Sequence, residues 1–123
     1  MRKAMFIFAA MLLVACDNNM TQPPAPSRDY TPAEQQTLAA GSARARTCAA
    51  CHGPRGISRN AMYPHLAGRS ANELSAALTA YRDGERKHAI MSPQARGLTD
   101  DDITLLSKYF ALLPAAATAT TAE

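Results

Sequence analysis

The stretch ARTCAACHGPRGIS, residues 45–58, decides how the rest of the chain is interpreted, because it contains two cysteines and a histidine in the order C-x-x-C-H. Cys48, Cys51 and His52 are compatible with four kinds of site. These are a disulfide, half of a zinc site, a dithiol redox centre and the attachment point of a haem. Features elsewhere in the sequence discriminate between them.

Three of these interpretations explain the stretch poorly. A disulfide between Cys48 and Cys51 would close a very small loop, add little stability and leave the histidine unexplained. A thioredoxin-like redox centre needs a βαβ setting, and the sequence shows no sign of one. A zinc site would need two more ligands. His65 and His88 are available, but no second cysteine pair and no finger-like spacing accompany them.

The order C-x-x-C-H is also the attachment signature of c-type haem. Two thiols three residues apart can bond the two vinyl-derived carbons at one porphyrin edge. The adjacent histidine is then held beneath the iron. The sequence therefore predicts one covalent haem c, attached through Cys48 and Cys51 with His52 as an axial ligand.

The N-terminus, MRKAMFIFAAMLLVAC, is typical of a secretory signal. Its uncharged run, residues 4–15, would reach only about 18 Å as a helix, against roughly 30 Å of hydrocarbon in a bilayer, so it is too short to span one. We predict a signal peptide over residues 1–15. Export suits the haem interpretation, because haem c is attached after export.

Residues 13–16, LVAC, resemble a bacterial lipobox, in which the signal is cut before a cysteine that becomes acylated. Lipidation of Cys16 would explain the odd number of cysteines in an exported chain, and two acyl chains suffice for stable anchoring. The alternative is an ordinary signal peptide with an incidental cysteine. Asp17 resembles an inner-membrane retention signal of enteric lipoproteins. We expect a bacterial periplasmic protein anchored to the inner membrane through Cys16.

A folded domain is expected over residues 31–114, between two segments without apolar periodicity. Residues 16–30 are polar and proline-rich and predict a flexible tether, whereas residues 115–123 are of low complexity and predict a disordered tail. From Cys16 onward, 11 basic residues accompany 10 acidic ones, so we expect no nucleic-acid partner. With no tryptophan and seven aromatic residues, a small core would gain from an apolar cofactor.

Three helices are predicted from their start signals, and strand signals are absent. The capping residues are Thr31, Ser70 and Thr99. We expect the first helix to reach Arg46, Gly84 to stop the second and Pro114 to end the third. Loops are expected over residues 53–69 and 84–97. The predicted fold class is therefore all-α.

A second axial ligand is expected from the loop over residues 84–97. Met91 lies 39 residues after His52, and a loop residue can reach the haem face opposite the histidine. A methionine is usually core filler, although a polar loop is an unusual place for filler. His88 is the rival ligand, which we interpret instead as a solvated surface residue.

The motifs of this sequence, taken in their order along the chain, resemble those of a class I c-type cytochrome, in particular the bacterial monohaem carriers. The resemblance covers roughly residues 41–113. The motifs are CAACHGPRGIS (48–58), YPHLAGRS (63–70), ELSAALTAYRDGER (73–86), Met91 and ARGLTDDDITLLSKYFALLP (95–114). The resemblance implies three main helices, with loops, wrapped around one covalently bound haem.

The resemblance also implies roles for particular residues. Cys48 and Cys51 would form the thioether bonds, and His52 and Met91 would be the axial ligands. The Pro64 carbonyl would accept a hydrogen bond from the other ring nitrogen of His52, which would fix the ring and raise its basicity.

Other family features are expected around this site. The first and last helices would cross, with Gly41 meeting either Tyr109 or Phe110. His65 departs from the family pattern and would add a titratable group near the haem. Met62 is interpreted as loop packing, and with neighbouring alanines would ring an exposed haem edge. Candidates for contact with the haem propionates or for a docking face are Arg55, Arg59, Arg69, Arg82 and Arg86.

Two protein ligands leave no open position for oxygen or peroxide, so we expect one-electron transfer and no enzymatic reaction. The expected partners are membrane or periplasmic redox proteins, such as an oxidase, a reductase or a dehydrogenase. A lipid anchor would keep the domain near them. One alternative is a fixed haem c subunit of a membrane oxidase or dehydrogenase complex. Another is a gas or peroxide site, which would require displacement of Met91.

Overall fold

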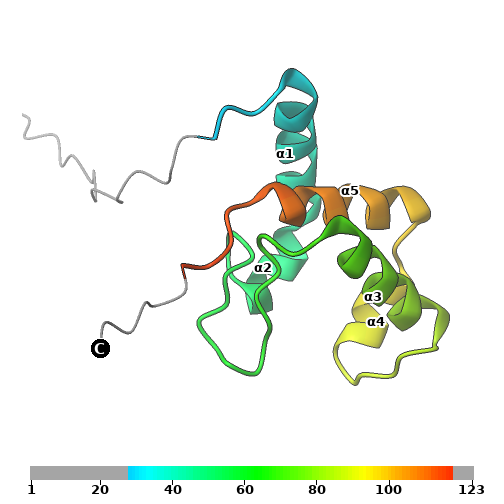
Figure 1. Ribbon diagram of the computed structural model, residues 1–123. Coiled ribbons are helices and arrows are strands. Elements are labelled where there is room, and N and C mark those ends of the chain that lie inside the picture. The colour runs from blue at the N-terminus through cyan, green and yellow to red at the C-terminus, as the bar shows by residue number, and fades with distance from the viewer. Residues whose placement is uncertain (1–27, 118–123) are drawn as a thin grey trace, which may run out of the picture.

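The protein is described by a computed structural model that covers residues 28–117, so the predicted signal peptide and Cys16 lie outside the described residues. The described part contains five helices and no strand, which confirms the all-α prediction. The helices are α1 (Pro32–Arg44), α2 (Arg46–His52), α3 (Ala71–Asp83), α4 (Met91–Arg96) and α5 (Asp100–Leu112) (Figure 1). None of them is long and apolar enough to cross a bilayer.

The three long helices begin at the residues that the sequence predicted. In each, a hydroxyl accepts a hydrogen bond from the backbone N–H three residues ahead, and a carboxylate at that position accepts one from the capping backbone. The pairs are Thr31 with Glu34, Ser70 with Glu73 and Thr99 with Asp102. These bonds satisfy donors that a helix start leaves unpaired. Gly84 ends α3 in the left-handed conformation, with φ of 85°, as predicted.

Two short helices were not predicted. The first helix ends at Arg44, two residues before the predicted end, and α2 follows after Ala45. α4 occupies part of the segment predicted as a loop over residues 84–97. Its N-cap residue is Ile90, so the usual Ser, Thr, Asp or Asn signal of a helix start is missing there.

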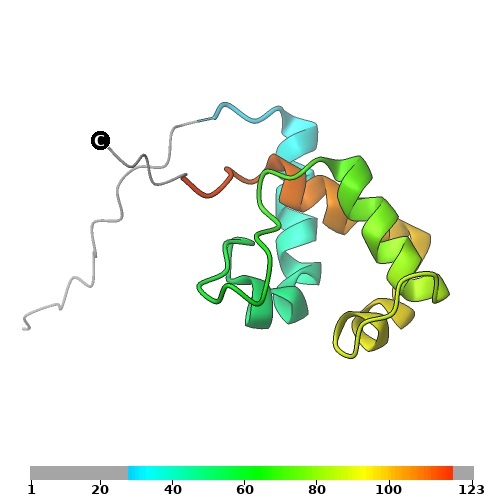
Figure 2. The same cartoon turned by 60° about the horizontal axis from the view of Figure 1, so that its bottom comes forward.

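α1 and α5 cross in both views of the molecule (Figure 1; Figure 2). At the crossing Gly41 lies against Tyr109, where an added Cβ would come within 2.6 Å of the Tyr109 Cγ. The prediction left Tyr109 and Phe110 open, and Tyr109 is the partner. Phe110 lies instead against Gly56. The buried cluster at the centre consists of Ala45, Leu74, Leu106, Tyr109 and Phe110.

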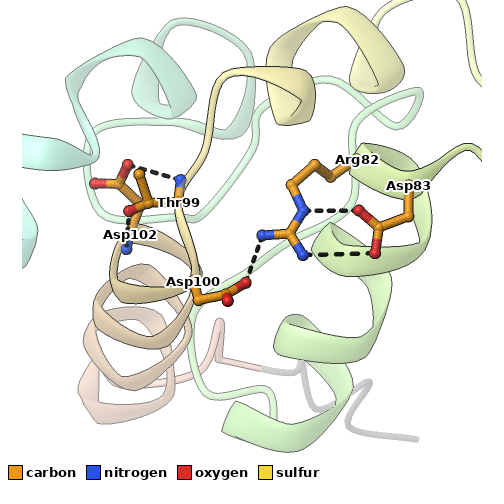
Figure 3. Close-up of polar contacts among 5 residues, drawn as sticks. All are labelled: Arg82, Asp83, Thr99, Asp100 and Asp102. Carbon is orange, nitrogen blue, oxygen red and sulfur yellow. Dashed lines mark hydrogen bonds and ion pairs between the residues drawn. The ribbon is translucent and has the colours of Figure 1, made fainter.

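Ion pairs join the first turn of α5 to two other helices. Arg44 of α1 donates from Nε to Asp102 Oδ1 at 2.5 Å and from Nη2 to Oδ2 at 2.9 Å. Arg82 of α3 donates to its neighbour Asp83 at 2.8 Å and to Asp100 at 2.6 Å. Figure 3 shows the Arg82 guanidinium between these two carboxylates, one from α3 and one from α5. The start of α5 is therefore held by both α1 and α3.

The segment between α2 and α3 folds back onto α5. The Gly56 carbonyl accepts hydrogen bonds from the backbone of Leu66 at 2.7 Å and of Ala67 at 3.1 Å. The Gly68 N–H donates to the Phe110 carbonyl at 2.9 Å. These bonds close a compact loop beside α2, and they bring Pro64 close to the end of that helix.

Candidate cofactor site

A cavity of about 730 Å³ lies among α2, α3, α4, α5 and the loop between α2 and α3. Cys48, Cys51 and His52 line it from α2, and Met91 lines it from α4. Its apolar lining includes Leu66, Leu74, Ala77, Leu78, Ala95, Leu98, Leu106 and Phe110. The volume lies within the range of about 300–1,000 Å³ that is usual for pockets holding small molecules and cofactors.

The helical conformation of α2 brings the three C-x-x-C-H residues to one side. Cys48, Cys51 and His52 stand at positions i, i+3 and i+4 of a seven-residue helix. Residues at this spacing share one helix face. The short helix, which the sequence did not predict, is therefore what turns all three side chains towards the same cavity.

His52 is held in one orientation by the loop beside it. Its side chain is buried, and its Nδ1 lies 2.8 Å from the Pro64 carbonyl oxygen. Because a carbonyl only accepts hydrogen bonds, Nδ1 carries the ring proton, and Nε2 keeps a lone pair that can ligate a metal. The Tyr63 ring packs edge-on against the imidazole, with 6.2 Å between ring centroids.

Met91 is the first residue of α4 rather than part of an irregular loop. His88 lies three residues before it and is exposed, as expected for a surface residue. However, its ring does more than contact solvent, because Nδ1 accepts hydrogen bonds from the N–H groups of Ile90 and Met91. His88 also lines the cavity.

The rival interpretations of the cysteine pair find little support. Cys48 and Cys51 are not joined by a disulfide. Burial raises the pKa of the Cys48 thiol, whereas a reactive dithiol needs a lowered pKa. Within residues 28–117, no group of three or more His, Cys, Asp or Glu side chains could hold a metal ion, so neither His65 nor His88 completes a zinc site.

The donor set of the cavity fits a haem. It combines a histidine with a free Nε2, a thioether sulfur, two thiols and apolar walls, and histidine with methionine is a known axial pair for haem iron. Ser107 is a further observation that the sequence did not suggest. Its side chain lines the cavity and is 2% exposed, and its hydroxyl has no hydrogen-bond partner in the described part of the chain. A polar atom of a bound molecule would satisfy it.

Only some of the polar and surface residues named from the sequence line the cavity. Of the five candidate arginines, Arg69 and Arg86 do so, together with Arg44, which was not a candidate. Arg82 is engaged by two carboxylates instead. Met62 also lines the cavity but is 83% exposed, so it lies on the rim, which agrees with its expected place beside an exposed haem edge and not with loop packing.

His65 lies elsewhere than expected. It is absent from the cavity lining, and its Nδ1 accepts a hydrogen bond from the Ser58 N–H at 2.9 Å. The prediction that it adds a titratable group to the haem surroundings is therefore not supported by the geometry. Its ring instead helps to shape the loop between α2 and α3.

Comparison with known proteins gives matches over this same region. The family model described as cytochrome c matches residues 38–113. Cytochrome c-554(548) of Halomonas halodenitrificans is 45% identical over 75 residues, which cover 58% of this chain and 90% of that one. The cytochrome subunit of sulfide dehydrogenase of Chlorobaculum tepidum is 33% identical over 103 residues, covering 83% and 90%. The crystal structure of reduced recombinant cytochrome c4 from Pseudomonas stutzeri is similar with a TM-score of 0.60 and 28% identity, covering 65% of this chain and 50% of that chain.

Proposed function

Because the chain belongs to the cytochrome c family, we propose that Cys48 and Cys51 bind haem c through thioether bonds and that His52 and Met91 ligate its iron. The protein is an electron carrier rather than an enzyme, and haem c is its cofactor. The observation that supports these four assignments is that all four side chains line one largely apolar cavity.

Haem supplies the chemistry of electron transfer, a reversible one-electron change at iron. The residues of this chain would hold it and adjust that change. The hydrogen bond between His52 Nδ1 and the Pro64 carbonyl, at 2.8 Å, keeps the ring in place and leaves the Nε2 lone pair available to the iron. The Met91 thioether would favour the reduced state. The leucines that line the cavity, together with Phe110, would exclude water from the bound haem.

A spectroscopic experiment tests the ligand assignment. The full chain is produced in a host that attaches haem c, and the oxidised protein should show the far-red band of a sulfur–iron bond. Met91→Ala should abolish this band, because it removes the thioether. Met62→Ala is the matched control, since that methionine is on the rim and exposed, and it should keep the band. Persistence of the band in Met91→Ala would assign the sulfur to another residue.

The partners are redox proteins, and we propose that they are a periplasmic or membrane oxidase, reductase or dehydrogenase. A second candidate function is that of a fixed subunit in a dehydrogenase complex. It is favoured by the similarity to the Chlorobaculum tepidum subunit, which extends over 83% of this chain. Purification from membranes in mild detergent separates the two. A fixed stoichiometry with a larger protein supports the subunit, and recovery of the cytochrome alone supports the free carrier.

Bacterial c-type cytochromes are generally periplasmic. We propose in addition that the chain is ordered as a signal peptide (1–15), a tether (16–30), the cytochrome domain (31–114) and a tail (115–123), with an acyl anchor in the inner membrane on Cys16. The LVAC stretch supports the anchor. Incorporation of labelled palmitate, with Cys16→Ala as the control, tests it.

A further inference from the structure

We infer that His88 is a positioning residue that holds the start of α4, and with it Met91, against α3. The inference rests on the proposed function, in which Met91 is an axial ligand. His88 Nδ1 lies 3.2 Å from the backbone nitrogen of Ile90 and 3.2 Å from that of Met91. An acceptor side chain that binds the N–H groups two and three residues ahead is the pattern of an N-cap. The imidazole therefore binds the backbone of the proposed ligand itself.

The backbone of His88 completes this arrangement. Its N–H donates to the Ser92 hydroxyl at 2.9 Å, and its carbonyl accepts from the Ser92 N–H at 3.0 Å. The Ser92 hydroxyl in turn donates to the Arg86 carbonyl at 3.3 Å. This exchange of bonds on both sides of Met91 resembles a capping box. It matters here because a six-residue helix such as α4 is too short to persist by its own backbone bonds.

The ring of His88 also connects α4 to a neighbouring helix. It packs edge-on against Tyr81 of α3, with 6.2 Å between ring centroids and 72° between the ring planes. Arg86 lies over the Tyr81 ring, 4.7 Å from its centroid. A small capping residue could accept the same hydrogen bonds but could not reach Tyr81 in this way. The histidine thus fixes Met91 with respect to the α3 wall of the cavity.

A competition experiment tests this role on the full chain with haem attached. Imidazole added to the oxidised protein competes with the Met91 sulfur, so its apparent affinity reports how firmly Met91 is held. His88→Leu keeps a bulky side chain but removes the acceptor. This variant should bind imidazole about fivefold more tightly, which is the factor that corresponds to the free energy of one lost N-cap. Its far-red band should also be weaker. His88→Asn restores an acceptor but not the ring contact with Tyr81, so its imidazole affinity should lie between those of the unchanged protein and His88→Leu.

Thr31→Ala is the matched control, because it removes the N-cap of α1 and Thr31 does not line the cavity. It should lower the urea midpoint without changing imidazole affinity. If His88→Leu behaves like Thr31→Ala, or if His88→Asn behaves like His88→Leu, the positioning role is wrong. Absence of the far-red band from the unchanged protein would instead overturn the assignment of Met91 itself. The two failures are therefore distinguishable.

Discussion

Gly41 is the residue that lets α1 and α5 approach each other at their crossing. A Cβ added there would overlap the Tyr109 side chain, coming within 2.6 Å of Cγ and 2.8 Å of Cδ2. Glycine within a helix costs about 0.5–1 kcal/mol relative to alanine, so the close approach must be worth more than this intrinsic cost. Tyr109 itself is buried and belongs to the central cluster, which makes the clash hard to relieve.

Gly41→Ala should therefore destabilise the protein despite its better helix propensity. The overpacking should lower the free energy of unfolding by about 1–3 kcal/mol, measured by urea denaturation followed by far-UV circular dichroism. Ser42→Ala is the control, because it raises helix propensity at the neighbouring position of α1, which is exposed and does not line the cavity. The stability of that variant should match that of the parent or exceed it slightly. Equal midpoints for the two variants would mean that α1 and α5 can move apart at no cost.

At the scale of elements, the start of α5 combines a cap with ion pairs to two helices. Asp102 accepts the Thr99 backbone N–H at 3.1 Å and also binds the Arg44 guanidinium through both of its oxygens. The guanidinium, followed by the Thr99 backbone bond, holds the pKa of Asp102 well below its usual range. Asp100 joins α3 through Arg82 (Figure 3). One helix end thus gathers contacts from three parts of the chain.

Asp102→Asn should reduce stability in a pH-dependent way. Because the folded pKa of Asp102 is lowered, its contribution is complete above the unfolded pKa of about 4 and is lost as the pH falls through the folded pKa. We expect a loss of about 1 kcal/mol at pH 7, the upper end for exposed pairs, and a smaller difference at pH 2.5. Urea denaturation at both pH values measures it.

Asp101→Asn is the control for that experiment. Asp101 lies in the same helical turn but makes no side-chain hydrogen bond or ion pair with any residue in the 28–117 region. It should show the smaller loss expected from the helix dipole alone. A loss for Asp102→Asn that is the same at both pH values would show that the carboxylate charge does not stabilise the fold.

For the whole molecule, the protein core is small and surrounds a large cavity. Eight hydrophobic residues are buried in the described part of the chain, and three of them are alanines. The cavity of about 730 Å³ is lined by residues from all five helices, with α1 contributing only Arg44 at its end. Side chains that line an empty apolar cavity lack contact partners, which makes a fold of this size marginal. The bound haem is therefore expected to be part of the core.

Removal of both attachment thiols should test this dependence. Cys48→Ala/Cys51→Ala, produced in a host that attaches haem c, should be recovered without covalent haem and should lose most of its helical circular dichroism and cooperative unfolding. Met91→Ala is the control, since it keeps both thioether positions and should stay coloured and helical. A colourless double variant with an unchanged unfolding midpoint would show that the helices pack without the cofactor.

The sequence by itself determined the features that depend on neighbours within a few residues. The starts of α1, α3 and α5 could be predicted because a cap joins residues three apart, as Thr31 and Glu34 do. The all-α class and the cytochrome c family followed from such signals and from the spacing of Cys48, Cys51 and His52. α4 was missed because its stabilising acceptor is the imidazole of His88, which no common capping pattern includes.

Only the tertiary structure decided the contacts between distant residues. It selected Tyr109 over Phe110 as the partner of Gly41, paired Arg44 with Asp102 across 58 positions, and removed His65 from the cavity while adding Ser107. The physical reason is the separation along the chain of the residues that make each contact. A hydrogen bond inside one helical turn is possible as soon as the turn forms, whereas a contact between helices depends on how all of their faces pack at once.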